Sequence, residues 1–171
     1  PFPRSPLVLE ITWEGHDLLL VNNHLKCGGD GVLEEDDSSD EENRRWVACQ
    51  MLENWIATEH PEDAVIVLGD LNDYLDDPAQ HNVFAPFLDL PDSYRFADMA
   101  IATGPAAGWS FGPGRGHLDH ILVTDELFAA LDAEGSACYT LRIDRELEGY
   151  YTTLVSDHLP VGVVLPGTAL P

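Results

Sequence analysis

One apolar run in the sequence ends abruptly in polar residues that are suited to a binding or catalytic site. The run Val65–Leu68 is typical of a buried strand, and Gly69, Asp70, Leu71 and Asn72 follow it directly. Because side chains alternate along an extended chain, Asp70 and Asn72 point to the same side. A carboxylate and a carboxamide at the mouth of a strand can bind a divalent cation, an attacking water and phosphate oxygens.

Three further polar motifs lie at predicted strand ends. Asn22-Asn23-His24-Leu25 precedes the first motif, and His117-Leu118-Asp119-His120 and Ser156-Asp157-His158-Leu159-Pro160 follow it. Hydrolysis of a phosphate ester needs a hard cation, a group that takes a proton from water, and stabilisation of the developing charge. The motifs offer the side chains for all three tasks: His24, Asp70, Asn72, Asp119, Asp157 and His158.

Other hydrolase classes find little support in the sequence. There is no HExxH or Cys2His2 spacing for a zinc hydrolase, and no GxSxG motif for a serine hydrolase. Cys27, Cys49 and Cys138 match neither a metal-binding pair nor a dense disulfide framework, so we interpret them as inert thiols.

In this order and spacing, the four motifs resemble the C-terminal half of the catalytic domain of the endonuclease/exonuclease/phosphatase superfamily, the DNase I-like hydrolases. The segment 23–26 is similar to the first histidine motif of the family, and 69–72 matches its most diagnostic motif. The segment 118–122 resembles the aspartate-containing strand, with His120 where the family often has Tyr. The segment 156–161 resembles the closing motif.

The resemblance implies a role for each motif residue. His158 would act as the general base or position the water, while Asp119 would accept its ring N–H. Asp70 and Asn72 would orient the nucleophile and the phosphate, and would contribute to a metal site. His24 would donate to the phosphoryl oxygens.

Two residues complete the predicted site. The resemblance implies that Asp157 is a magnesium ligand, and Arg115, just before the Asp119 strand, is expected to contact substrate phosphate together with Asn72. The expected cofactor is Mg2+ or Mn2+, with Ca2+ as an alternative.

The activity that follows is metal-dependent hydrolysis of a phosphate ester by in-line attack of water. A phosphodiesterase or nuclease is favoured, with a nucleic acid or a small diester as substrate. The alternatives are a phosphomonoesterase or sphingomyelinase-like enzyme, and a non-catalytic binding module or inactive fragment.

The resemblance also implies an α+β fold that forms part of a four-layer α/β/β/α sandwich. In the family, the N-terminal half supplies a metal-binding Glu and an Asn, and this chain begins at Pro1 after both. We therefore expect residues 1–171 to be a single truncated domain. Its expected partner is the missing N-terminal half, in cis or as another chain. Glu10 is expected to be an outward-facing strand residue rather than a replacement for the family's Glu.

Hydrophobic periodicity predicts the elements that position these residues. We expect a β-hairpin from Leu7–Trp13 and Asp17–His24, and then one long helix over Asn43–Glu59. Residues 28–42 are expected to form an acidic mobile loop. The later strands are expected over 64–68, 118–123, 137–143 and 159–165, with short helices over 83–88 and 125–131. We expect His117 at the surface or in a turn, and His120 as a structural or supporting residue that points away from Asp119.

The composition is strongly acidic, with 31 Asp and Glu against 8 Lys and Arg and a net charge of −23. Such a chain repels polyanions, which favours either a high-salt habitat or a substrate that is not a long polyanion. The few basic residues could form at most a small cluster near the substrate, drawn from Lys26, Arg44, Arg45, Arg95 and Arg115. No apolar run approaches the ~20 residues that span a bilayer, so no membrane span is expected. A secreted or periplasmic location is favoured.

Overall fold

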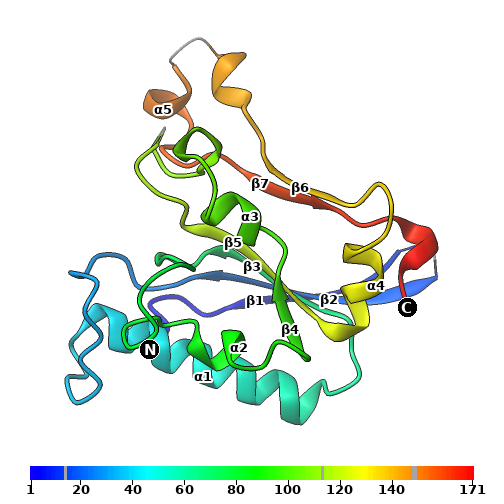
Figure 1. The fold of residues 1–171 in the computed structure, drawn as a ribbon, viewed down its shortest axis with the longest axis horizontal. Coiled ribbons are helices and arrows are strands. Elements are labelled where there is room, and N and C mark those ends of the chain that lie inside the picture. Colours follow the sequence, from blue (N-terminus) through cyan, green and yellow to red (C-terminus); the bar gives the residue numbers. More distant parts are fainter. Residues whose placement is uncertain (14, 113, 148–149) are drawn as a thin grey trace.

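The computed structural model describes residues 1–13, 15–112, 114–147 and 150–171. A mixed five-stranded sheet forms its centre, in the order β1-β2-β3-β5-β4 (Figure 1). The strands are β1 (Leu7–Trp13), β2 (His16–His24), β3 (Val65–Asp70), β4 (Tyr94–Phe96) and β5 (Asp119–Thr124). β2 pairs in parallel with β3, whereas the other neighbours are antiparallel.

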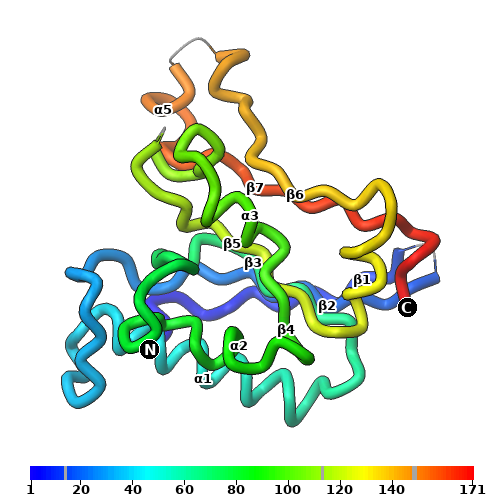
Figure 2. Tube along the Cα trace, viewed as in Figure 1, coloured from blue at the N-terminus to red at the C-terminus, as the bar shows by residue number. Residues whose placement is uncertain are grey.

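A long helix, α1 (Glu41–Glu59), covers one face of this sheet (Figure 1). Parallel pairing requires a crossover connection, and α1 provides it between β2 and β3 (Figure 2). The helix starts two residues before the predicted Asn43, because the Asp40 side chain accepts a hydrogen bond from the Asn43 N–H at 2.8 Å. Between helix and sheet lies a core that includes Val21, Val67 and Leu122 from the strands and Ala48, Leu52 and Ile56 from α1.

The opposite face of the sheet is covered by a separate antiparallel pair, β6 (Ala137–Thr140) and β7 (Val161–Val164). A second core lies here, with Ile66, Ile121 and Val123 from the main sheet and Cys138, Val161 and Val163 from the pair. Helix, sheet and second sheet therefore form successive layers. The predicted α+β class and its relation to the layered DNase I-like sandwich are confirmed.

Short helices connect the strands. These are α2 (Ala85–Leu88), α3 (Met99–Ala102), α4 (Phe128–Leu131) and α5 (Tyr151–Leu154), and single 3-10 turns cover 106–108, 125–127, 143–145 and 167–169. The sequence did not predict β4, α3 or α5. The predicted helix over 125–131 divides into a 3-10 turn and α4, while the Thr124 hydroxyl bonds Asp63 and Val65 instead of capping it.

The acidic segment 28–42 is tied to the start of α1. The Asn43 side-chain amide contacts the carbonyl oxygens of Glu34, Glu35 and Asp37 at 2.8 to 3.2 Å. The buried Glu42 carboxylate accepts from the Gly31 N–H at 2.7 Å. The mobility of this segment stays a prediction.

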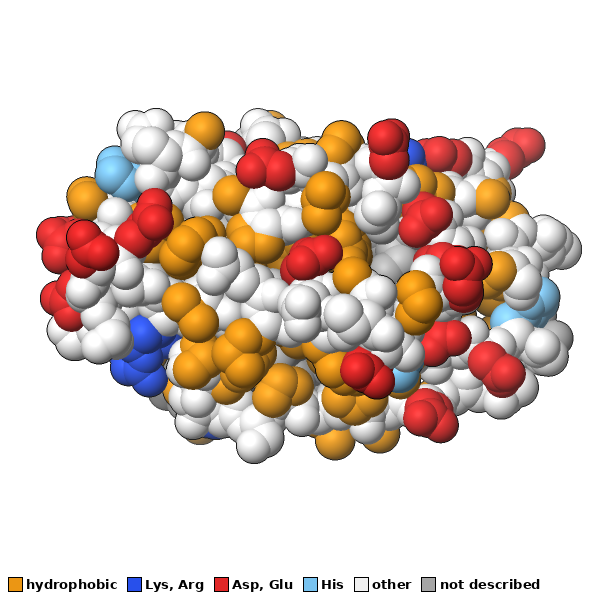
Figure 3. Space-filling model, turned by 90° about the horizontal axis from the view of Figure 1, so that it is seen from below, with side chains coloured by type: hydrophobic (Ala, Val, Ile, Leu, Met, Phe, Trp, Pro, Cys, Tyr) orange, Lys and Arg blue, Asp and Glu red, His pale blue; other side chains and the backbone are white. Residues whose placement is uncertain are grey.

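The surface matches the acidic composition. On the side of the molecule opposite β6 and β7, acidic side chains are scattered between apolar ones and are present at both ends (Figure 3). The edge strand β1 is exposed along its whole length, including Leu7, Leu9 and Trp13. Among the described residues, no helix is long and apolar enough to cross a membrane.

Candidate active site

Three adjacent strands place polar side chains at one edge of the main sheet. β2 and β3 run parallel, so their last residues, His24 and Asp70, are paired in register. β5 runs antiparallel to β3 and begins at Asp119, which is paired with Asp70. Hydrophobic runs that end at the same level thus bring together three residues that are distant in the sequence.

His158 reaches this edge from the loop that precedes β7. Its backbone N–H bonds the Ser156 hydroxyl at 3.0 Å, and its carbonyl accepts from the Tyr151 hydroxyl at 3.0 Å. The next residue, Leu159, donates its N–H to the Ser110 carbonyl at 2.7 Å. The Phe111 ring lies 4.8 Å from the His158 ring, centroid to centroid. The His158 loop is therefore held at several points.

The His158 ring has the orientation of a base. Its Nδ1 lies 2.7 Å from Asp119 Oδ2, so the ring donates its Nδ1–H to this carboxylate and leaves Nε2 as an acceptor. Nε2 faces Asp70 Oδ2 at 3.9 Å. The hydrogen bond to Asp119 raises the pKa of His158 above its ordinary value, against the opposing effect of partial burial.

Asp70 lies between two histidines. Besides His158, its Oδ2 faces His24 Nε2 at 3.6 Å. Burial raises the pKa of the Asp70 carboxyl, and the negative charge of Asp119 raises it further. His24 Nδ1 accepts a hydrogen bond from the Arg4 guanidinium, which has no acceptor of its own, so the His24 proton is on Nε2. Arg4 was not predicted as part of the site, because nothing in the sequence relates it to His24.

Asn72 closes the turn after β3. Its φ of +58° is in the left-handed region, which non-glycine residues rarely adopt and which Asn tolerates best. Its N–H bonds Asp70 Oδ1 at 3.1 Å, and its side-chain amide donates to the Leu25 carbonyl at 3.2 Å. Asn72 therefore joins the turn after β3 to the end of β2 and restrains the Asp70 carboxylate.

Arg45 anchors the same turn from α1. The side chain is 2% exposed and donates from Nε to Asp73 Oδ2 at 2.7 Å. Its Nη1 bonds the carbonyls of Lys26 and Gly28 at 2.7 and 2.8 Å. Arg45 was expected as a candidate for a small basic cluster near the substrate, but it is buried and bonded to groups up to 28 residues away in the sequence.

Two predicted site residues, Asp157 and Arg115, lie outside the group formed by His24, Asp70, Asn72, Asp119 and His158. Asp157 is exposed; its charge helps to raise the pKa of His158, and its backbone carbonyl accepts from Gly112. Arg115 is also exposed, and its backbone N–H donates to the Gly112 carbonyl. Their predicted roles in metal and substrate binding stay predictions.

The donor set fits a hard divalent cation. Within the described residues, ligand atoms of Asp70, Asp119 and His158 lie within 4.8 Å of one another. Asp119 is bound to the His158 ring, whereas Asp70 Oδ2 faces ring nitrogens of His24 and His158 at 3.6 and 3.9 Å. Burial, and next the negative charge of Asp119, raise the pKa of Asp70, and a bound cation would offset both effects by stabilising the carboxylate.

The fold of this chain is similar to that of several solved structures. The chain is similar to D. rerio TDP2 complexed with a single-strand DNA product (16% identity, TM-score 0.56, covering 91% of this chain and 59% of that one). It is also similar to an AP endonuclease from Archaeoglobus fulgidus (18% identity, TM-score 0.56, covering 93% of this chain and 65% of that one). A third similar structure is truncated Caenorhabditis elegans TDP2 (14% identity, TM-score 0.54, covering 95% of this chain and 61% of that one). The chain thus spans about three fifths of the length of these structures. None of the curated proteins compared with it matches.

A family model gives the assignment. The model described as the endonuclease/exonuclease/phosphatase family matches residues 3–158, a range that contains His24, Asp70, Asn72, Asp119 and His158. The predicted resemblance is therefore confirmed, and this chain belongs to the endonuclease/exonuclease/phosphatase family.

Proposed function

We propose that this chain carries the site of a metal-dependent phosphodiesterase or nuclease, in which water attacks the phosphorus in line. Membership of the endonuclease/exonuclease/phosphatase family supports a phosphoesterase. The observation that carries the finer proposal is the orientation of His158. Asp119 accepts its Nδ1–H, and the free Nε2 faces Asp70 Oδ2 at 3.9 Å, at the end of β3.

Each side chain has a task in this proposal. His158 Nε2 takes a proton from the attacking water, and Asp119 stabilises the imidazolium that forms. His24, which carries its proton on Nε2, donates a hydrogen bond to a phosphoryl oxygen. Asp70 and Asn72 orient the water and the phosphate.

Mg2+ or Mn2+, with Ca2+ as an alternative, would be held by Asp70 and Asn72, with Asp157 as a further ligand, and would neutralise charge on the phosphoryl oxygens. Arg115 is proposed to contact the substrate phosphate. Its exposed position allows this contact.

The substrate is proposed to be a phosphodiester, either in a nucleic acid or as a small diester. The net charge of −23 disfavours tight binding of a long polyanion at low salt. A phosphomonoesterase or sphingomyelinase-like activity is the alternative within the same chemistry. A non-catalytic binding module or an inactive fragment is the alternative outside it, and the hydrogen-bonded Asp119–His158 pair argues against the binding module.

The proposed partner is the remaining part of the family domain, in cis or as another chain. The chain spans about three fifths of the structures it resembles, and β1 exposes Leu7, Leu9 and Trp13. Burial of such an apolar strand against another segment would stabilise both.

The experiment that tests this proposal compares a diester with a monoester. The full chain is assayed with bis(p-nitrophenyl) phosphate and p-nitrophenyl phosphate in Mg2+, Mn2+, Ca2+ or EDTA. We expect diester turnover that depends on metal and exceeds monoester turnover. Preference for the monoester would favour the phosphomonoesterase. A folded chain that binds phosphate esters without turnover would favour the binding module or an inactive fragment that needs the remaining part of the family domain.

A further inference from the structure

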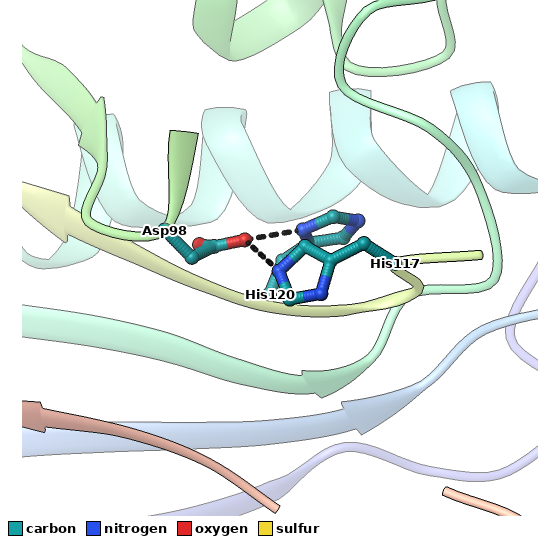
Figure 4. A group of neighbouring side chains, drawn as sticks. All are labelled: Asp98, His117 and His120. Atoms are coloured by element: carbon teal, nitrogen blue, oxygen red, sulfur yellow. Dashed lines mark hydrogen bonds and ion pairs between the residues drawn. The ribbon is translucent and has the colours of Figure 1, made fainter. Parts of the chain in front are cut away.

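A second polar group lies beneath the candidate active site. Asp98, His117 and His120 are buried, with exposed fractions of 0%, 1% and 1%, and Figure 4 shows both imidazoles directed at one carboxylate. Because side chains alternate along β5, His120 points away from Asp119, as predicted. The expectation that His117 lies at the surface or in a turn was wrong, since Asp98, its buried partner, lies 19 residues away in the sequence.

The hydrogen bonds of this group define where its protons lie. Asp98 Oδ2 is 2.9 Å from His117 Nε2 and 2.6 Å from His120 Nδ1, and Asp98 Oδ1 accepts from the Ile121 N–H at 2.8 Å. His117 Nδ1 accepts from the Ser110 N–H at 3.3 Å, so its proton is on Nε2.

His120 has an acceptor at each ring nitrogen. Nδ1 faces the Asp98 carboxylate, and Nε2 faces the backbone carbonyl of Asp73 at 2.9 Å. Both nitrogens therefore donate, and His120 is an imidazolium paired with Asp98. Burial alone would raise the pKa of Asp98, but the hydrogen bonds from the two histidines outweigh it and hold this pKa well below its usual range.

His120 connects this group to the turn that carries Asp70 and Asn72. The carbonyl that His120 holds belongs to Asp73, the residue after the left-handed Asn72. From the other side, the N–H groups of Leu71 and Asn72 bond the Leu118 carbonyl at 2.8 and 3.3 Å. His120 thus fixes this turn from inside the core.

His117 connects the group to the His158 loop. His117 accepts from the N–H of Ser110, which is fully buried. The carbonyl of the same Ser110 accepts from the N–H of Leu159, next to His158, at 2.7 Å. Asp98 is thus connected to both loops of the site through two different histidines.

These contacts do not have the geometry of a metal site. The carboxylate-to-nitrogen distances of 2.6 and 2.9 Å are those of hydrogen bonds, and ligands around a zinc ion lie farther apart. The remaining nitrogens of both rings already have partners on Asp73 and Ser110. Every ring nitrogen is therefore used within the protein.

We propose that Asp98 is a positioning residue for the reaction, because it holds the Asp70–Asn72 turn through His120 and the His158 loop through His117. The effect on turnover rests on the proposed function. The effect on the two loops does not, and can be measured without activity.

The kinetic test compares Asp98→Asn and His120→Phe with Thr124→Val in the full chain. Thr124 provides a matched control, because it is buried at the end of β5 opposite Asp119. Thr124→Val removes the hydroxyl that bonds Asp63 and Val65. With bis(p-nitrophenyl) phosphate and Mg2+, we expect kcat to fall about 10- to 100-fold in the Asp98 and His120 variants, since small misplacements of reacting groups have effects of this size. KM should change far less, and Thr124→Val should keep the kcat of the parent.

The second test uses nuclear magnetic resonance on the same proteins. In the parent chain, the nitrogen resonances of His120 should show protons on both Nδ1 and Nε2. In Asp98→Asn, the amide resonances of Asp73 and Leu159 should both shift, whereas Thr124→Val should leave them in place.

Several outcomes would overturn the proposal. These are a His120 ring with one proton, stoichiometric zinc in the purified protein, unshifted Asp73 and Leu159 amides, or variants whose folded fraction has the parent kcat. If Asp98→Asn does not fold, the kcat of His120→Phe and the number of protons on the His120 ring in the parent chain still test the positioning role. A parent chain without phosphodiesterase activity would refute the proposed function alone, since the amide shifts would still test the positioning role.

Discussion

The close approach of β2 and β3 beside the active site makes Gly69→Ala an informative perturbation. Gly69 has a φ of +126°, and a Cβ there would lie 2.0 Å from the backbone oxygen of Asn23. Real Cβ atoms keep at least 3.0 Å from such neighbours, so the two strands would have to separate by about 1 Å. The next pair in register is His24 and Asp70, and their 3.6 Å side-chain distance would lengthen.

The size of the effect follows from two contributions. A backbone angle in this region costs an L-residue about 1–3 kcal/mol. Overpacking against an atom that cannot rotate away adds about 1–3 kcal/mol. Gly31→Ala is the control, because Gly31 has a φ of +81° and an added Cβ would meet nothing within 4 Å. Gly31→Ala therefore has the cost of the backbone angle without the cost of overpacking.

The assay combines thermal unfolding with turnover. At about 2–4 °C per kcal/mol for a chain of this length, Gly69→Ala should unfold about 2–12 °C below Gly31→Ala. Measured well below both transitions, its kcat with bis(p-nitrophenyl) phosphate should be reduced about 100-fold, because a 1 Å misplacement has effects of this order. Equal Tm values for the two variants would refute the reasoning from the strand contact.

Three further predictions concern other parts of the site. Asp119→Asn should lower kcat at least about 100-fold while KM changes little, since it removes the acceptor that orients His158; an unchanged kcat in steady-state assays would contradict this role. Arg45→Met should lower the free energy of unfolding by about 3–5 kcal/mol in urea titrations, because it leaves the buried Asp73 carboxylate unpaired, and a loss under 1 kcal/mol would contradict the anchoring role. The folded-state pKa of Asp98 is lowered, so its stabilising effect is present above pH ~3.8 and is lost as the pH falls below that value. The difference in urea midpoint between the parent and Asp98→Asn should therefore shrink from pH 5 to pH 3, and a constant difference would argue against an ionised Asp98.

The sequence was sufficient to predict those site residues and elements that depend on a pattern within one segment. Asp70 and Asp119 each lie at the end of an apolar run, and alternation along the strand correctly predicts that His120 points away from Asp119. The hairpin of β1 and β2 and the helix α1 were predicted for the same reason, since their periodicity is contained within each segment.

What the sequence did not predict depends on pairs that are distant along the chain. Arg45 was counted among the basic residues that could cluster near the substrate, because only the fold brings its partner Asp73 to it. His117 was expected at the surface or in a turn, because only the fold brings Asp98 to it. Short elements such as β4 have three residues, too few for periodicity to identify them, and are stabilised by pairing with β5. Charged and polar residues that are buried against distant partners are therefore where pattern-based reasoning fails.

The most direct test of the central role of His158 is chemical rescue. His158→Gly and the control Thr124→Val are assayed as chains of residues 1–171 with bis(p-nitrophenyl) phosphate and Mg2+, with and without added imidazole. If His158 Nε2 takes the proton from water, His158→Gly should lose at least about 100-fold in kcat, and imidazole should restore part of the loss in that variant alone. A folded His158→Gly chain with the parent kcat would contradict the proposed mechanism.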